Sequence, residues 1–223
     1  MRANRFWQIA YPMAVYYLMY HFLHILFLVI TGGRLGSLEC LTLASAITLV
    51  VMVVCYRKLP ITRAISEKRT IAQVLQWTGA ILLTVAVGIL LNILISNTPL
   101  ADLSVGYQEA NSTLFSGGLL IKIVGNALLI PMLEEVVYRG IVCGQLLQWY
   151  GQWKAVFFSA FLFGIMHFNV VQFLYGFVMG LALGYIYVDS HGGSWTGKFC
   201  GNTCYRSVLV VTGGKKWKTA GLH

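Results

Sequence analysis

The chain has 223 residues, of which 58% are hydrophobic and only 10% are charged, and its mean hydropathy is +0.74. Soluble domains usually carry about 25% charged residues. This composition excludes an ordinary cytosolic domain, a disordered protein and a nucleic-acid-binding module. The net charge is +9, from 16 Lys and Arg against 7 Asp and Glu. The composition predicts an all-α, multi-pass transmembrane bundle, because a helix satisfies its own backbone hydrogen bonds within lipid.

Six continuous apolar stretches predict six helical segments, since a membrane span needs roughly 20 apolar residues. They cover residues 7–30, 38–56, 71–95, 117–149, 155–168 and 170–188. The last two are slightly short, so the last three segments need not be simple perpendicular spans. The runs are continuous and do not alternate between apolar and polar residues, which argues against a β-barrel.

The basic residues predict the orientation of the bundle. Arg2 and Arg5 lie at the N-terminus, and the loop 57–69 carries five Lys and Arg, whereas the polar loop 96–116 carries none. By the positive-inside rule, the N-terminus and the loop 57–69 are cytoplasmic and the loop 96–116 is outside. We therefore expect a multi-pass protein of a bacterial cell membrane.

Glu134 and Glu135 are adjacent within the apolar stretch 117–149. Each charge at membrane depth costs at least ~2.5 kcal/mol, so such residues need partners or a hydrated cavity. Glu135 and Arg139 are four residues apart and can pair on one helix face. Glu134 points about 100° away from Glu135 and has no such partner on its own helix, which makes it a candidate general base.

Phe163 and His167 lie four residues apart at the end of the stretch 155–168, on one helix face. A lone His in an apolar helix is more often a hydrogen-bonded core residue than a catalyst. Here, however, the Glu-Glu-x-x-x-Arg segment lies about thirty residues upstream. A helix hairpin of that length would bring the two polar faces together.

These two segments, Glu134-Glu135-x-x-x-Arg139 and Phe163-x-x-x-His167, resemble the motifs of the CPBP family of intramembrane proteases. That family includes the CAAX-prenyl endopeptidases and bacterial proteins tied to bacteriocin processing or self-immunity. The resemblance divides the chain into N-terminal transmembrane helices and an outer loop (1–116), a protease-like core (117–197) and a basic, Gly-rich tail (198–223). It implies an endopeptidase that hydrolyses a peptide bond of a membrane-associated or leader-peptide substrate.

The resemblance also implies a role for each motif residue. Glu134 would polarise the attacking water as general base, and His167 would hold or activate that water or ligate a metal. Arg139 would hold Glu135 and fix the helix geometry. The family is often called a metalloprotease family, but the chain has no His-Glu-x-x-His zinc motif.

The same residues allow two mechanisms, one with a metal ion and one without. Glu134 and His167 are candidate ligands for a divalent metal such as zinc, and activation of water by these two residues without a metal is equally plausible. The expected partners are a peptide or protein substrate and the lipid bilayer, and no nucleic acid.

The chain departs from the family after residue 197. A third motif, His-x-x-x-Asn or His-x-x-x-Asp, is expected there on a further apolar helix, but neither His191 nor His223 is followed by such a residue. One hypothesis is a C-terminus altered by truncation, frame change or divergence from about residue 197. If the tail is authentic, a catalytically impaired scaffold acting as an immunity factor or regulator becomes the alternative function.

A third reading is a small transporter that uses Glu134 and Glu135 as a proton or cation site. The absence of an evident internal repeat weakens it.

Two weaker signals concern packing. Gly176, Gly180 and Gly184 recur every four residues, a spacing that lets membrane helices approach closely. His21 and His24 share one face of the first span without an acidic or Cys partner nearby, so we expect them to be core or interface residues.

Overall fold

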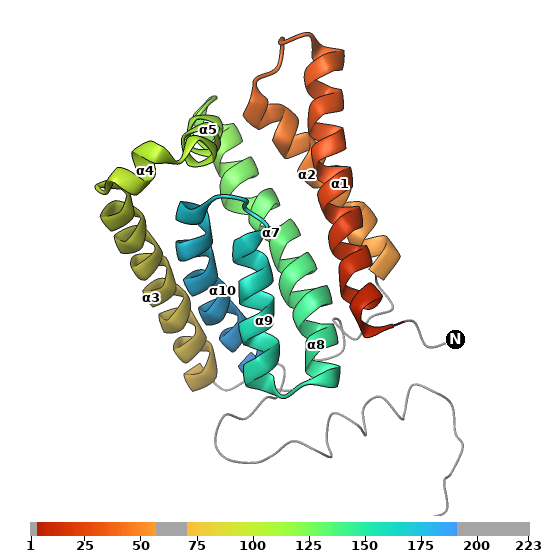
Figure 1. Cartoon of the computed structure of the whole chain (residues 1–223), viewed down its shortest axis with the longest axis vertical. Helices are drawn as coiled ribbons and strands as arrows, with labels where there is room; N and C mark the ends of the chain where they lie inside the picture. Colours follow the sequence, from red (N-terminus) through yellow and green to blue (C-terminus); the bar gives the residue numbers. More distant parts are fainter. Residues whose placement is uncertain (1–3, 57–70, 191–223) are drawn as a thin grey trace, which may run out of the picture.

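The computed structural model describes residues 4–56 and 71–190, and the regular structure in these ranges is helical throughout. Five single helices are α1 (Arg5–Thr31), α2 (Ser37–Tyr56), α3 (Ile71–Ser96), α9 (Gln152–Ile165) and α10 (Val170–Ser190). They lie side by side with a sixth, composite helix in one bundle (Figure 1). The predicted all-α fold with six apolar helical segments is confirmed.

The composite helix runs from Leu119 to Trp149 and carries the Glu-Glu motif. Its parts are α6 (Leu119–Ile121), the π-helical η3 (Lys122–Leu129), α7 (Ile130–Glu134), the π-helical η4 (Glu135–Cys143) and α8 (Gly144–Trp149). π-Helical turns within a helix are frequent at functional sites. Here Glu134 is the last residue of α7 and Glu135 is the first of η4.

The described residues contain four helices that are long and apolar enough to cross a membrane, or up to five if the bent pair Val105–Leu114 and Leu119–Trp149 forms one span. α9 is shorter, with 14 residues, which at 1.5 Å per residue fall short of the ~30 Å hydrocarbon core. The expectation that the last segments are not all simple spans is therefore confirmed for α9.

The stretch 96–116, predicted as a loop, contains two short helices instead, α4 (Pro99–Leu103) and α5 (Val105–Leu114). Pro99 begins α4 at a position where its missing N–H costs nothing. Ala101 and Tyr107 are buried against Val171 of α10. This small apolar contact is what orders a stretch whose composition predicts only a polar connection.

α9 and α10 form a hairpin whose backbones touch. A Cβ atom on Gly180 would lie 2.9 Å from the Cα of Ala160, and one on Gly184 would lie 3.0 Å from the Cγ1 of Val156. Gly176 faces the same helix, with the Cα of Gly164 3.7 Å away. The predicted close packing along these three glycines is confirmed.

The α9–α10 turn lies level with α7 and below α4 and α5 in Figure 1. α5 reaches this turn, since a Cβ on Gly106 would lie 3.7 Å from the Cβ of Asn169. On the other side, the core is formed by α1, α2 and η4, which bury Met13, Met52 and Val137 together. The middle of the composite helix is thus enclosed by α1, α2 and the α9–α10 hairpin.

Both histidines of α1 make local or interhelical contacts, as expected for core or interface residues. His24 Nε2 lies 3.2 Å from the hydroxyl of Ser37 at the start of α2. The ring of His21 lies against that of Tyr17, with 4.3 Å between the ring centres. The predicted basic loop 57–69 and the tail 198–223 lie outside the described residues, and so does the position of the hypothesised change in the C-terminus.

Candidate functional site

Glu135 and Arg139 form the predicted ion pair on the composite helix. Arg139 Nη1 lies 3.4 Å from Glu135 Oε1, and the side chain of Arg139 is 2% exposed whereas that of Glu135 is 44% exposed. The pair is therefore asymmetric, with a buried cation held by a carboxylate that still reaches the surface of the bundle. Such a buried guanidinium depends on its partner for charge compensation.

The guanidinium of Arg139 also packs on an aromatic ring. Its central carbon lies 4.6 Å from the centre of the Phe163 ring on α9, within the range of a cation–π interaction. None of its three nitrogens has a hydrogen-bond partner among the described residues. Stacking and the ion pair with Glu135 are thus the contacts that fix this side chain.

His167 lies in the turn between α9 and α10, outside the candidate spans. Its Nδ1 is 2.9 Å from the backbone carbonyl oxygen of Phe163. A carbonyl only accepts hydrogen bonds, so Nδ1 carries the hydrogen in this contact and Nε2 of the neutral ring is an acceptor. Burial lowers the pKa of His167, against the smaller raising effect of its backbone hydrogen bonds, which favours this neutral form.

The residue after His167 has an unusual backbone. Phe168 has a φ of 55°, and among the described residues it is the non-glycine residue with a positive φ. This backbone conformation is uncommon for a bulky side chain. Its ring lies against that of Tyr17 on α1, with 5.4 Å between the centres. The turn that carries His167 is therefore held against α1 as well as α10.

Phe163 joins the two predicted motifs. Its ring contacts the ring of His167, with 5.1 Å between centres, and that of Tyr138, at 5.0 Å. Together with the guanidinium of Arg139, three side chains from two segments surround one ring. Ser159 Oγ, one turn earlier on α9, donates a 2.9 Å hydrogen bond to the carbonyl of Tyr138 and holds η4 against α9.

Several tyrosines near Glu134 complete the site, and none of them was predicted as a site residue. The hydroxyl groups of Tyr138, of Tyr175 on α10, and of Tyr16 and Tyr20 on α1 lie within electrostatic range of the Glu134 carboxyl group. The ring of Tyr16 meets that of Tyr138 edge to face, with 6.0 Å between centres. The signal that could have found the two on α1 is the run Tyr16-Tyr17 followed by Tyr20, an unusual density of hydroxyls in an apolar span.

The structure brings the predicted site residues together in two groups. Glu135, Arg139 and His167 are linked through the ion pair and the Phe163 ring, while half-buried Glu134 lies within electrostatic range of the tyrosines and of Arg139. Within residues 4–56 and 71–190, no hydrogen bond or ion pair joins Glu134 directly to His167.

The donor set gives little support for a metal. Nowhere in the described part of the chain do three or more His, Cys, Asp or Glu side chains lie where they could hold a metal ion. Glu134 and His167 are two ligands, and a protein zinc site uses at least three.

The predicted motif residues Glu134, Glu135, Arg139 and His167 lie in a segment that matches a known family. Residues 116–200 match the family described as type II CAAX prenyl endopeptidase Rce1-like. This segment contains both motifs and the whole α9–α10 hairpin. Comparison with curated proteins gave no match, and comparison with solved structures gave none either.

The match covers both motifs, including Phe163 of the second motif and its contact with Arg139 of the first. It supports the resemblance drawn from the motifs, at the level of the intramembrane proteases that include CAAX-type enzymes. The membrane-length apolar helices also support an integral membrane protein. Together these observations support an integral membrane protein related to a family of peptidases.

Proposed function

We propose that this protein is an intramembrane endopeptidase that cleaves a membrane-associated or leader-peptide substrate with water activated by Glu134 and His167. The observation that carries the proposal is the packing of Arg139 and His167 against the same ring, Phe163. This packing brings into contact two motifs that lie about thirty residues apart, which supports a shared site. The family match over residues 116–200 supports a peptide bond as the target.

In this reaction Glu134 and His167 each accept a hydrogen bond from the attacking water. His167 Nε2 is suited to this because Nδ1 donates to the Phe163 carbonyl. As the water oxygen forms its bond to the carbonyl carbon, Glu134 takes one proton. When the carbon–nitrogen bond breaks, Glu134 returns that proton to the leaving amine, so the step balances without a further reactant.

The remaining motif residues hold this arrangement in place. Arg139 fixes Glu135 through the ion pair and rests on Phe163, and its charge also acts on the carboxyl group of Glu134. Neither Glu135 nor Arg139 needs to contact the substrate in this reading.

The test is cleavage of a leader-peptide library by the purified full-length chain in detergent. Glu134→Gln and His167→Ala should each lower the cleavage rate by about 10²-fold or more, the usual contribution of a positioned acid–base group. Glu109→Gln, which alters an exposed carboxylate on α5, is the matched control and should cleave like the wild type. Equal rates for Glu134→Gln and the wild type would contradict the proposal.

A catalytically impaired scaffold, acting as an immunity factor or regulator, is the second candidate. The observation that favours it is the lack of a His-x-x-x-Asn or His-x-x-x-Asp segment after His167 in the sequence. It predicts a folded wild type that cleaves nothing, and a cellular phenotype that survives Glu134→Gln. The peptidase predicts loss of both cleavage and phenotype in that variant.

A further inference from the structure

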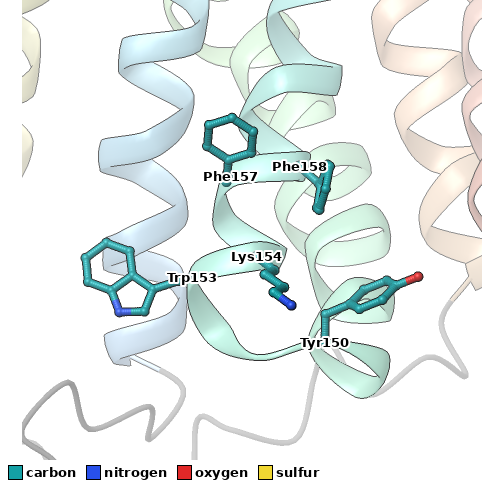
Figure 2. Close-up of a pocket in the computed structure, with 5 residues that line it drawn as sticks. All are labelled: Tyr150, Trp153, Lys154, Phe157 and Phe158. Atoms are coloured by element: carbon teal, nitrogen blue, oxygen red, sulfur yellow. The ribbon is translucent and has the colours of Figure 1, made fainter.

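A cluster of exposed aromatic side chains around one lysine lies at the opposite end of α9 from His167. They line a cavity of about 610 Å³ that is open to the surface, at the turn between α8 and α9, formed by Tyr150, Trp153, Lys154, Phe157 and Phe158 (Figure 2). None of these residues belongs to the proposed peptidase site. The cluster therefore calls for a separate explanation.

The cavity combines one positive charge with exposed aromatic surface. Lys154 is its only charged lining residue, and no ion pair to it exists within the described ranges. Trp153 is 72% exposed, and Phe157 and Phe158 are 50% and 46% exposed. A ligand that suits both features is amphipathic and carries a negative charge.

The order of these residues along α9 matches the order of groups in a phospholipid. Tyr150, Trp153 and Lys154 gather at the turn, and Phe157 and Phe158 lie further along the helix in Figure 2. Trp and Tyr are enriched where a bilayer meets water, and a Lys there can reach the headgroups. A small soluble anion would leave the phenylalanines exposed, so it fits less well.

The same end of the bundle carries a further cation. Arg5, at the start of α1, lies 6.0 Å from the centre of the Trp149 ring, and Trp149 directly precedes Tyr150. The predicted orientation places this end of the bundle in the cytoplasm. The cytoplasmic leaflet carries anionic lipids, which attract basic side chains close to the membrane surface.

We infer that this cavity binds one anionic phospholipid, with the headgroup phosphate at Lys154 and an acyl chain along Phe157 and Phe158. Trp153 and Tyr150 flank the headgroup region. This site is independent of the proposed peptidase activity, because it uses none of the same residues and its test measures binding alone.

The test is native mass spectrometry of the purified full-length chain titrated with phosphatidylglycerol or with phosphatidylcholine of the same acyl chains. The wild type should retain phosphatidylglycerol preferentially. Lys154→Gln should weaken that affinity about fivefold, the effect of one Lys near a membrane surface, and leave phosphatidylcholine binding unchanged. Phe158→Ser should weaken the binding of both lipids, because it removes part of the acyl-chain wall.

Lys122→Gln is the matched control, since Lys122 lies near the start of the composite helix, at the other end of the bundle, and its loss should change neither affinity. Three results would overturn the inference. They are equal affinity of the wild type for both lipids, equal loss for Lys122→Gln and Lys154→Gln, and displacement of phosphatidylglycerol by inorganic phosphate.

Discussion

Arg139 and Phe163 are the two residues that join the halves of the site, with the guanidinium carbon 4.6 Å from the centre of the ring. The same ring meets that of His167 at nearly a right angle, with 86° between their planes. A cation, a phenyl ring and an imidazole therefore follow one another between η4 and the α9–α10 turn. Because the ring is 8% exposed, this contact excludes water and depends on the size and shape of the ring.

Phe163→Leu should destabilise the protein by about 1–2 kcal/mol, because leucine keeps much of the volume but removes the aromatic and cation–π contacts. The matched control is Phe158→Leu on the same helix, at a position that is 46% exposed, and it should change stability little. Thermal unfolding followed by intrinsic fluorescence in detergent compares the two. Equal shifts in Tm would show that Phe163 contributes no more than a surface aromatic.

The asymmetric burial of the Glu135–Arg139 pair gives a prediction about which partner matters more. Glu135→Gln leaves a 2% exposed guanidinium without its carboxylate, and should cost about 2 kcal/mol, less than a fully buried pair because Glu135 is partly hydrated. Arg139→Met removes the buried charge and leaves a carboxylate that water can reach, so it should cost about 1 kcal/mol or less.

The double variant Glu135→Gln with Arg139→Met separates this account from a purely steric one. Its stability should match that of Arg139→Met alone, because neither variant contains a buried guanidinium without its carboxylate. Tm values of the three variants in one detergent provide the measurement. If Arg139→Met proves the more damaging single change, stranded charge is not what governs this pair.

The sequence predicts the six apolar helices because bilayer thickness imposes a long, continuous hydrophobic pattern that few other structures share. It also predicts the Glu135–Arg139 pair and the packing of Gly176, Gly180 and Gly184, since both depend on spacing within one helix. These features are local, and local spacing is what a sequence displays directly.

The features that escaped prediction depend on contacts between distant segments. Tyr16 and Tyr20 join the site because α1 packs against η4, and nothing within α1 indicates that neighbour. The ordering of α4 and α5 likewise depends on Tyr107 meeting Val171 of α10. α5 is too short for its helical periodicity to indicate this contact.

Gly180 and Gly176 offer a matched pair for testing the α9–α10 contact. A Cβ on Gly180 would lie 2.9 Å from the backbone of Ala160, whereas one on Gly176 would lie 3.7 Å or more from any neighbour. Gly180→Ala should cost about 1–3 kcal/mol, because the two helices must move apart. Gly176→Ala should be neutral or slightly stabilising, since alanine favours the helix.

Thermal unfolding of both glycine variants, beside the wild type, checks this difference. The helix propensity of the two substitutions is the same, so any gap between their Tm values reports the interhelical distance. Similar Tm values for both variants would contradict the close approach at Gly180.

Tyr107 provides the last prediction, because its hydroxyl ties α5 to α3. It donates a 3.1 Å hydrogen bond to Asn92 Oδ1 and lies 3.0 Å from the hydroxyl of Ser96, while its ring is buried. Tyr107→Phe should remove about 1 kcal/mol from the attachment of α5 and keep the ring contact with Val171. Local opening of α4 and α5 over the α9–α10 turn should then increase about fivefold.

A cysteine at Asn169, which lies next to Gly106 of α5, reports this opening through its rate of maleimide labelling in a background in which the native cysteines are replaced. Tyr11→Phe, at an exposed tyrosine of α1, is the control and should leave the rate unchanged. Faster labelling with an unchanged Tm would show that α5 opens as a local unit. An unchanged labelling rate would mean that the ring of Tyr107, rather than its hydroxyl, holds α5 in place.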